Sequence, residues 1–126
     1  MIVDEKNAFN EINQVGMIWT VRLLWLSGAC FVFNCYCHWS LLVLQNGNGA
    51  ASFLHSREGV TQGDPLTMIA YRISILPLIK NIKREILDVT QPWYSDDAGY
   101  LGTSARLDKY FDSLTRQGTG RGYHPK

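Results

Sequence analysis

An excess of charge of one sign is missing from this 126-residue sequence, in which 12 lysine and arginine residues stand against 11 aspartate and glutamate residues. A complete nucleic-acid-binding domain usually carries a strong basic excess. Composition therefore argues against recognition by bulk positive charge, and any nucleic-acid partner must be inferred from motifs. Disorder is also disfavoured, because 46% of the residues are hydrophobic and 12% are aromatic, enough for an ordinary buried core.

Cysteine is scarce, with only Cys30, Cys35 and Cys37 in the chain. An odd number without a secretory signal indicates free thiols, no disulfide framework and a reducing intracellular compartment, the nucleus or the cytoplasm. Together with His38 these residues raise the question of a zinc site. The C-x4-C-x-C-H spacing lacks the two separate ligand pairs that a tetrahedral site usually needs, so we expect buried strand residues instead.

Formal charge is absent between Arg22 and Arg57, and the run over 23–44 is apolar enough to suggest a membrane span. Polar residues and glycine interrupt this run, among them Gly28 and Asn34. A stable transmembrane helix prefers an unbroken apolar run. We therefore expect no membrane contact.

The first half of the chain reads as a strand, a helix and a hairpin. Residues 2–4 predict a short buried strand that ends at a carboxylate, and the apolar spacing over about 9–26 predicts a helix stopped by Ser27 and Gly28. Residues 31–44 are rich in β-branched and aromatic side chains. Turn residues over 45–49 then lead into a second strand, the pattern of a β-hairpin.

The middle of the chain predicts a long amphipathic helix. Apolar residues recur every three or four positions from Leu66 to Ile86. Asp64 is placed to cap this helix and Pro65 occupies its first position. Pro77 lies inside the pattern, where it should bend the helix.

The last third predicts a second tight hairpin over 93–101 with an acidic tip, then a helix that Thr103 or Ser104 caps and Gly118 stops. The complete order is strand, helix, hairpin, helix, hairpin, helix. This order predicts a single α+β domain over 1–126, with helices packed on one face of a mostly antiparallel sheet.

Three carboxylates carry the chemistry suggested by this arrangement. Asp96 and Asp97 lie at the tip of the second hairpin, and Asp4 ends the first strand. If the two strands are neighbours, these side chains converge, and their mutual repulsion calls for cations. Magnesium is the natural partner, because it takes oxygen ligands from carboxylates and from substrate phosphates.

Three motifs follow one another along the chain: Asp4 with Phe9 five residues later, Gln62-Gly63-Asp64-Pro65-Leu66, and Tyr94-Ser95-Asp96-Asp97. In order and approximate spacing they resemble three motifs of the palm domain of reverse transcriptases, the RNA-directed DNA polymerases. The resemblance covers nearly the whole chain. The stretch over 57–66 is most similar to enzymes of non-LTR retrotransposons and group II introns.

The resemblance implies a palm-like antiparallel sheet and a catalytic site that holds two Mg²⁺ ions, with Mn²⁺ as an alternative metal. Asp4 and Asp96 would bind the metals, and Asp97 would supply a further carboxylate. Two such ions would support nucleotidyl transfer, in which a primer hydroxyl attacks a nucleotide phosphate. Read alone, an Asp-Asp pair is more often a solvated turn.

The same resemblance implies roles in substrate binding for four other residues. Phe9 matches the aromatic that packs under the incoming sugar and selects deoxynucleotides. Gln62 and Gly63 match the segment that lines the template and nucleotide pocket. Tyr94 corresponds to an aromatic near the primer end. Without the resemblance, Phe9 and Tyr94 read as core residues, and Gln62 and Gly63 as a turn before a helix.

The chain departs from the family pattern in several places. Asn10 stands where many relatives carry aspartate, and Ser95 stands where alanine is frequent. Only three residues precede Asp4, so the resemblance predicts a partial palm domain over 1–126 in which the family's fingers and thumb are not represented. Lys126 falls somewhat early for the downstream lysine that the family uses as a proton donor.

The resemblance therefore predicts a fragment of an enzyme that uses an RNA template, a DNA primer and deoxynucleoside triphosphates, inactive in isolation. Two alternatives remain open. One is a non-catalytic remnant of a retroelement that acts at most as a binding module. The other is a general interaction domain in which the motif set is fortuitous.

Overall fold

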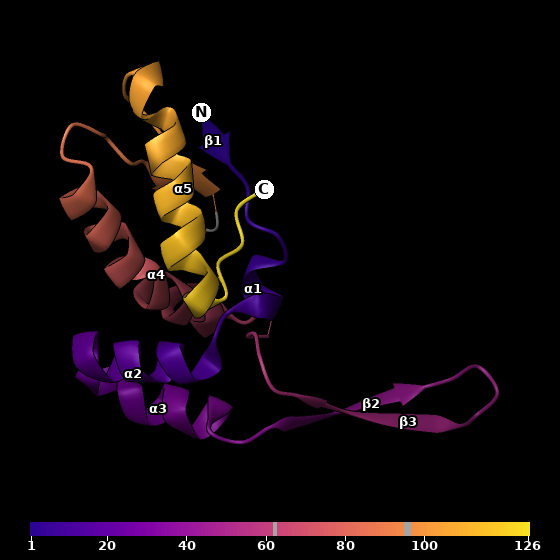
Figure 1. The fold of residues 1–126 in the computed structure, drawn as a ribbon. Coiled ribbons are helices and arrows are strands. Elements are labelled where there is room, and N and C mark those ends of the chain that lie inside the picture. Colours follow the sequence, from indigo (N-terminus) through magenta and orange to yellow (C-terminus); the bar gives the residue numbers. More distant parts are fainter. Residues whose placement is uncertain (62, 95–96) are drawn as a thin grey trace.

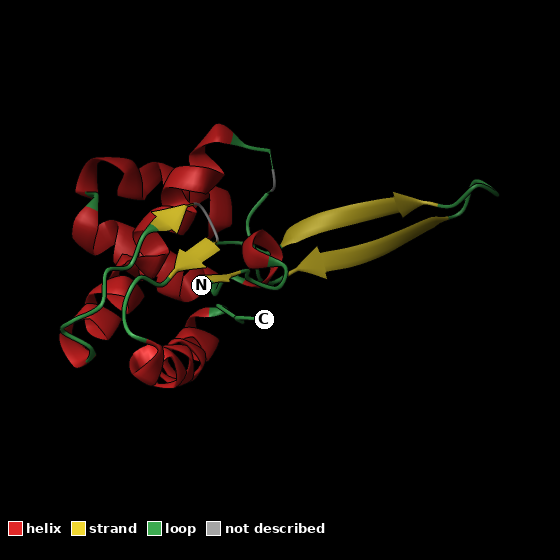
Figure 2. Ribbon diagram, turned by 90° about the horizontal axis from the view of Figure 1, so that it is seen from above, coloured by secondary structure: helices red, strands yellow, loops and turns green. Residues whose placement is uncertain are grey.

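The structure is a computed structural model that describes residues 1–61, 63–94 and 97–126, so Gln62, Ser95 and Asp96 lie outside the account that follows. The described residues form helices and antiparallel strands, which confirms the predicted α+β class (Figures 1 and 2). The elements are β1 Ile2–Val3, α1 Ala8–Glu11, α2 Gln14–Leu24, α3 Leu26–Tyr36, β2 Ser40–Gln45, β3 Ala51–Ser56, α4 Pro65–Glu85, β4 Trp93–Tyr94, β5 Asp97–Gly99 and α5 Leu107–Gly118.

A small antiparallel sheet joins the beginning of the chain to its last third. Its strand order is β1-β5-β4, so β5 is the central strand. Val3 of β1 and Trp93 of β4 both pair with Ala98 of β5, and Tyr94 pairs with Asp97. The predicted hairpin over 93–101 is therefore confirmed, and the predicted first strand is its neighbour.

One face of this sheet is covered by α4 and α5. Val3 and Ala98 lie opposite each other in the ladder, so their side chains share a face. Both belong to a buried cluster that the two helices complete, with Leu78 and Ile82 from α4 and Tyr110 and Leu114 from α5. The predicted packing of helices on one face of the sheet is confirmed.

The same helix α4 also forms a second cluster with the first helices. Ile75 and Tyr71 lie one and two turns before Leu78, respectively, and pack with Met17 of α2 and Val32 of α3. The predicted start of α4 is confirmed, because the Asp64 side chain accepts a hydrogen bond from Leu66 N at 2.9 Å and Pro65 follows at the first position. The helix continues through Pro77 to Glu85.

The prediction of one helix over about 9–26 is wrong. The chain forms α1, then α2, and then turns at Trp25, whose non-helical backbone (φ −143°, ψ 69°) ends α2 before α3 begins. Gly28 lies inside α3 and does not stop a helix. A Cβ atom at Gly28 would lie 2.5 Å from the ring of Trp25, so the glycine is needed for close packing rather than for a turn.

The prediction of a strand from residue 31 is also wrong for residues 31–36, which belong to α3. Val32 is buried against Met17 and Val21, a helical contact that β propensity could not reveal. Cys30 and Cys35 are exposed on this helix and Cys37 is half-buried, which corrects their expected burial in a strand. All three thiols are free, as predicted. Among the described helices, none is long and apolar enough to cross a membrane.

The first predicted hairpin is confirmed from residue 40 onwards. β2 and β3 pair antiparallel over their whole length, from Ser40 opposite Ser56 to Gln45 opposite Ala51. In both views the two strands extend away from the helices as a ribbon (Figures 1 and 2).

The last helix follows the prediction in its length and its buried face, but not in its cap. A 3-10 turn at Ser104–Arg106 leads into α5, and the Thr103 side chain makes no capping hydrogen bond. After a further 3-10 turn at Thr119–Arg121, Gly122 adopts φ +78° and directs the chain back along α1. Asn13 N then donates to Arg121 O at 3.0 Å, which attaches this turn to the start of α2.

Substitution of Gly122 by alanine should destabilise the fold by about 2–4 kcal/mol, because L-residues avoid this backbone conformation and an added methyl group overpacks the site. A Cβ atom there would lie 1.8 Å from Glu11 O. The midpoint of urea unfolding measures the loss. Gly120→Ala is the matched control, since no atom lies within 4 Å of its Cβ position. Equal midpoints for the two variants would contradict the assignment.

Candidate metal centre at the ends of β1 and β5

Asp4 and Asp97 lie at the same end of the central strand pair. Val3 pairs with Ala98, and the antiparallel register continued by one residue brings Asp4 opposite Asp97. Asp4 directly follows β1 and its side chain is 56% exposed, whereas Asp97 begins β5 and is half-buried. Both residues thus lie at the same end of the β1–β5 pair, where their sequence positions suggested that carboxylates would converge.

The third predicted carboxylate, Asp96, lies outside the described residues, as does Ser95. Asp97 itself was predicted at the hairpin tip. It lies in β5, paired with Tyr94 across the hairpin. The Tyr94 side chain is 77% exposed, so the reading of this residue as part of the core is wrong. An exposed aromatic beside Asp97 is free to contact a ligand at this edge.

The last residues of the chain run antiparallel to residues 4–6. Lys6 N donates to His124 O at 2.9 Å, Lys126 N donates to Asp4 O at 3.0 Å, and Glu5 and Pro125 form a bridge between these bonds. The Lys126 ammonium lies 3.3 Å from Asp4 Oδ2. The tail therefore holds the backbone of Asp4 in place and brings one positive charge to its carboxylate.

The donor set suits a hard divalent cation. Carboxylate oxygens are the ligands that Mg²⁺ prefers, and one or two of them together with substrate phosphates commonly hold it. Within the described ranges no group of three histidine, cysteine, aspartate or glutamate residues is arranged to hold a metal, including the cysteines near His38. Asp4 and Asp97 supply the oxygen donors that such a cation takes.

Buried tyrosine supports the strand that carries Asp97. The Tyr110 hydroxyl of α5 donates to Gly99 O at 3.0 Å, at the other end of β5. Burial raises the pKa of Tyr110 from 10.0 to about 12, because the ionised phenolate would lose its hydration. Gly99 is also clamped from the other side, where a Cβ atom would lie 2.4 Å from the ring of Pro92. These contacts fix the position of β5.

Phe9 lies in α1, half-buried against α4. Its ring centroid is 4.9 Å from that of Tyr71, with the planes tilted by 47°. The Phe9 carbonyl accepts a hydrogen bond from Val60 N at 2.6 Å. This bond attaches the loop before α4 to α1, so the predicted nucleotide-binding residue Phe9 lies next to the segment that leads to the other two.

The loop that leads to Gln62 and Gly63 depends on glycine. Gly59 adopts φ +78°, and a Cβ atom there would lie 2.5 Å from Asn10 O, so only glycine fits against α1. Gly63 adopts φ +93° and is exposed, with no atom within 4 Å of its Cβ position. Gln62 lies outside the described residues. Gly63 thus offers open backbone in the loop that Val60 attaches to Phe9. Open backbone of this kind suits the predicted close approach of a ligand.

Glu5 is a buried residue of this region that belongs to none of the sequence motifs. It is 4% exposed, and the Tyr71 hydroxyl donates a hydrogen bond to its carboxylate. Tyr71 thereby contacts both the residue after Asp4 and the ring of Phe9. No local sequence pattern predicts that a glutamate beside an aspartate is buried. The burial of Glu5 follows from its hydrogen bond with Tyr71, which lies 66 residues further along the chain.

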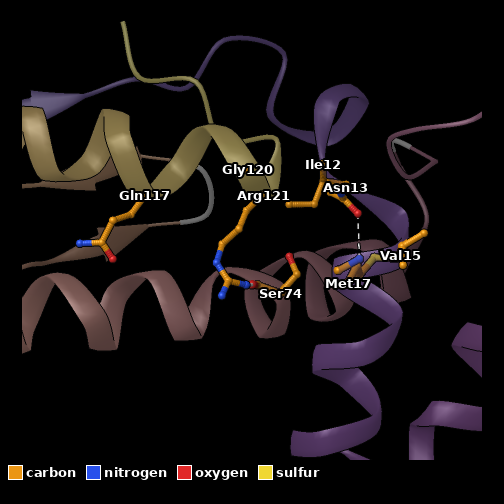
Figure 3. Close-up of a pocket in the computed structure, with 9 residues that line it drawn as sticks. Ile12, Asn13, Val15, Met17, Ser74, Gln117, Gly120 and Arg121 are labelled. Atoms are coloured by element: carbon orange, nitrogen blue, oxygen red, sulfur yellow. Dashed lines mark hydrogen bonds between the residues drawn. The ribbon is translucent and has the colours of Figure 1, made fainter.

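A cavity of about 490 Å³ opens elsewhere, between α2, α4 and the end of α5 (Figure 3). The Arg121 guanidinium approaches it and donates to Ser74 O at 3.5 Å, while the Asn13 side chain accepts from Gly16 N at 2.8 Å. Among the residues that the structure describes, no carboxylate lines this cavity, and none of the predicted site residues does. Its chemistry does not suit a divalent metal.

Comparison with known protein families finds none that matches the chain, and no curated protein matches it either.

The stability of the chain should fall as the pH rises from 10 towards 12, because Tyr110 then ionises in the unfolded chain before it ionises in the folded one. Below pH 10 this contribution is fully present. A shift to about 12 corresponds to roughly 2–3 kcal/mol. Urea unfolding across this pH range measures the slope.

Tyr110→Phe should flatten that slope. It should also lower stability at neutral pH by about 1 kcal/mol through loss of the bond to Gly99. Tyr94→Phe is the control, since its side chain is exposed. An unchanged slope in Tyr110→Phe would show that burial of this hydroxyl does not set the alkaline limit.

Proposed function

We propose that this chain is part of the palm of a reverse-transcriptase-type polymerase, and that its parent protein performs RNA-templated DNA synthesis. The observation that supports the proposal most directly is the pairing of Val3 in β1 with Ala98 in β5, a register that, continued by one residue, brings Asp4 opposite Asp97. These two residues come from motifs 93 positions apart in the sequence. Their meeting at one sheet edge is what a shared metal centre requires.

The reaction is a nucleotidyl transfer. The 3′-hydroxyl of a DNA primer attacks the α-phosphorus of a deoxynucleoside triphosphate, a new phosphodiester bond forms, and pyrophosphate leaves with the broken bond's electron pair. Asp4 and Asp97, with Asp96, would hold two Mg²⁺ ions, and such ions would activate the hydroxyl and stabilise the leaving oxygen. The carboxylates themselves orient the ions and balance their charge.

The other residues of the site position substrate. Phe9, whose ring contacts Tyr71, would pack beneath the sugar of the incoming nucleotide. Gly63, open and at positive φ, permits backbone approach to the base and template, beside Gln62. Tyr94, exposed next to Asp97, contacts the primer end.

These 126 residues alone should give no measurable primer extension on an RNA template with Mg²⁺ and deoxynucleoside triphosphates. Charge is nearly balanced, so nothing here supplies the basic grip that a triphosphate and a duplex need. Incorporation of a labelled nucleotide measures the activity. Extension that disappears in Asp96→Asn but persists in Asp88→Asn, an exposed carboxylate paired with Arg106, would overturn this expectation.

Magnesium should bind at the sheet edge, and Lys126 should oppose it. Titration with Mg²⁺ is expected to shift the amide NMR signals of Asp4 and Asp97. Lys126→Gln should tighten binding by about twofold to fivefold, because it removes an exposed ion pair of modest strength from Asp4. Lys80→Gln, a change at an exposed lysine of α4, should leave the affinity unchanged. Absence of any shift at Asp4 and Asp97 would count against an assembled site.

The second candidate function is a non-catalytic remnant that acts at most as a binding module. The observation that favours it is the ion pair of Asp4, whose carboxylate is met by Lys126 in the folded chain. Primer extension by a longer protein distinguishes the polymerase from the non-catalytic remnant. A longer protein that contains this chain should lose primer extension when Asp4 is changed to asparagine, and a remnant has no such activity to lose.

A further inference from the structure

The ribbon of β2, β3 and the turn between them, here called the arm, has no function in the proposed chemistry. Its two strands pair with each other, and the sheet that carries Asp4 and Asp97 is separate from it. In both views it extends away from the helices (Figures 1 and 2). An isolated two-stranded hairpin is at best marginally stable in water, so a surface of this kind calls for a partner.

Both faces of the arm are apolar. Residues opposite each other in the ladder share a face, so Leu41, Val43 and Phe53 lie on one face with His55, and Leu42, Leu44 and Leu54 lie on the other. The side chains of all six apolar residues are about half exposed. Strands apolar on both faces are typical of buried sheets, not of solvated ribbons.

The two faces differ in what lies at the root of the arm. Leu42 lines a cavity of about 220 Å³ with Asn10 and Tyr36, so its face is turned towards the body of the protein. The face of Leu41, Val43 and Phe53, here called the outer face, instead continues into an aromatic surface. Trp39 lies beside His55 and, with Trp19 and Phe33, lines a separate cavity of about 380 Å³.

The outer face and the aromatic surface that continues it are together large enough for a protein interface. Six side chains of this combined surface are each more than half exposed: Trp19, Phe33, Trp39, Leu41, Val43 and Phe53. Together they offer on the order of 600 Å² of apolar area. Each partner contributes roughly 800 Å² to a standard protein interface, so a partner that covered this surface and its rim would reach that size.

Charge decides which partner fits. The arm has no formal charge between residues 40 and 56, and the first cation after it, Arg57, is stacked 4.1 Å from the ring centroid of Trp39. A phosphate backbone or an anionic membrane surface would find no cations along the strands. Two identical neutral surfaces meet without repulsion, which favours a second copy of this chain.

From these observations we propose that the chain forms a twofold symmetric dimer in which the outer faces of two arms pack against each other. A twofold interface uses the same patch on both copies, which a single apolar face satisfies. Packed sheets lie about 10 Å apart, so the side chains of Val43 and Phe53 would interdigitate with those of the second copy. This dimer does not depend on the proposed polymerase function.

Sedimentation velocity of the full 126-residue chain across the micromolar range tests the proposal. The expected result is a reversible equilibrium between monomer and dimer. Val43→Lys should weaken dimerisation by about 100-fold or more, because each dimer would bury two like charges at the interface. Phe53→Lys, on the other strand and directly opposite Val43, should have the same effect.

The matched control is Leu44→Lys, which lies on the same strand with similar exposure but on the opposite face. It should change dimerisation by no more than a few-fold. Amide NMR signals of β2 and β3 establish that the arm remains paired in each variant. If Val43→Lys loses this pairing, Phe53→Lys is used in its place, and the reverse holds if Phe53→Lys loses it.

Three results would overturn the proposal. The first is a chain that stays monomeric at every concentration. The second is equal weakening by Leu44→Lys and Val43→Lys, which indicates edge pairing or non-specific association. The third is a monomer whose arm instead binds single-stranded RNA, phospholipid vesicles or a different protein, with the arm signals shifting on addition of that partner.

Discussion

Burial of helix α4 on two sides is the constraint on which the rest of the structure depends. Its first half packs Tyr71 and Ile75 against α2 and α3, and its second half packs Leu78 and Ile82 against the small sheet and α5. A two-residue strand such as β1 has too few hydrogen bonds to persist alone. It is held because its buried side chain completes a cluster that α4 has already organised.

The candidate site inherits its geometry from this helix rather than from its own side chains. Tyr71 of α4 contacts the ring of Phe9 and the carboxylate of Glu5. One residue of α4 therefore positions both the aromatic of the first motif and the residue that follows Asp4. On the other side Tyr110 fixes β5 through Gly99. Asp4 and Asp97 thereby lie on rigid backbone while their carboxylates remain accessible, an arrangement that suits binding of ions and substrate.

The site and the arm divide the molecule by polarity. The edge that carries Asp4, Asp97 and Lys126 is charged and accessible, whereas the chain from residue 23 to residue 56 has no formal charge and ends in an exposed apolar ribbon. A large exposed apolar patch usually marks an interaction surface. The proposed chemistry and the proposed dimer therefore concern different parts of one fold, and either proposal can fail without the other.

Local patterns in the sequence determined the elements whose signals are local: the Asp64-Pro65 start of α4, the apolar face of α5, the tight hairpin around Asp97 and the α+β class. They did not determine α3, because apolar residues 31–36 suit a strand as well as a buried helix, and only the packing of Val32 on α2 decides between them. The motifs likewise named Asp4 and Asp97 as partners without placing them. Their meeting, the burial of Glu5 under Tyr71 and the contact of Lys126 with Asp4 all join residues more than 60 positions apart. Such contacts depend on the energy of the whole packed core, which no short stretch of sequence contains.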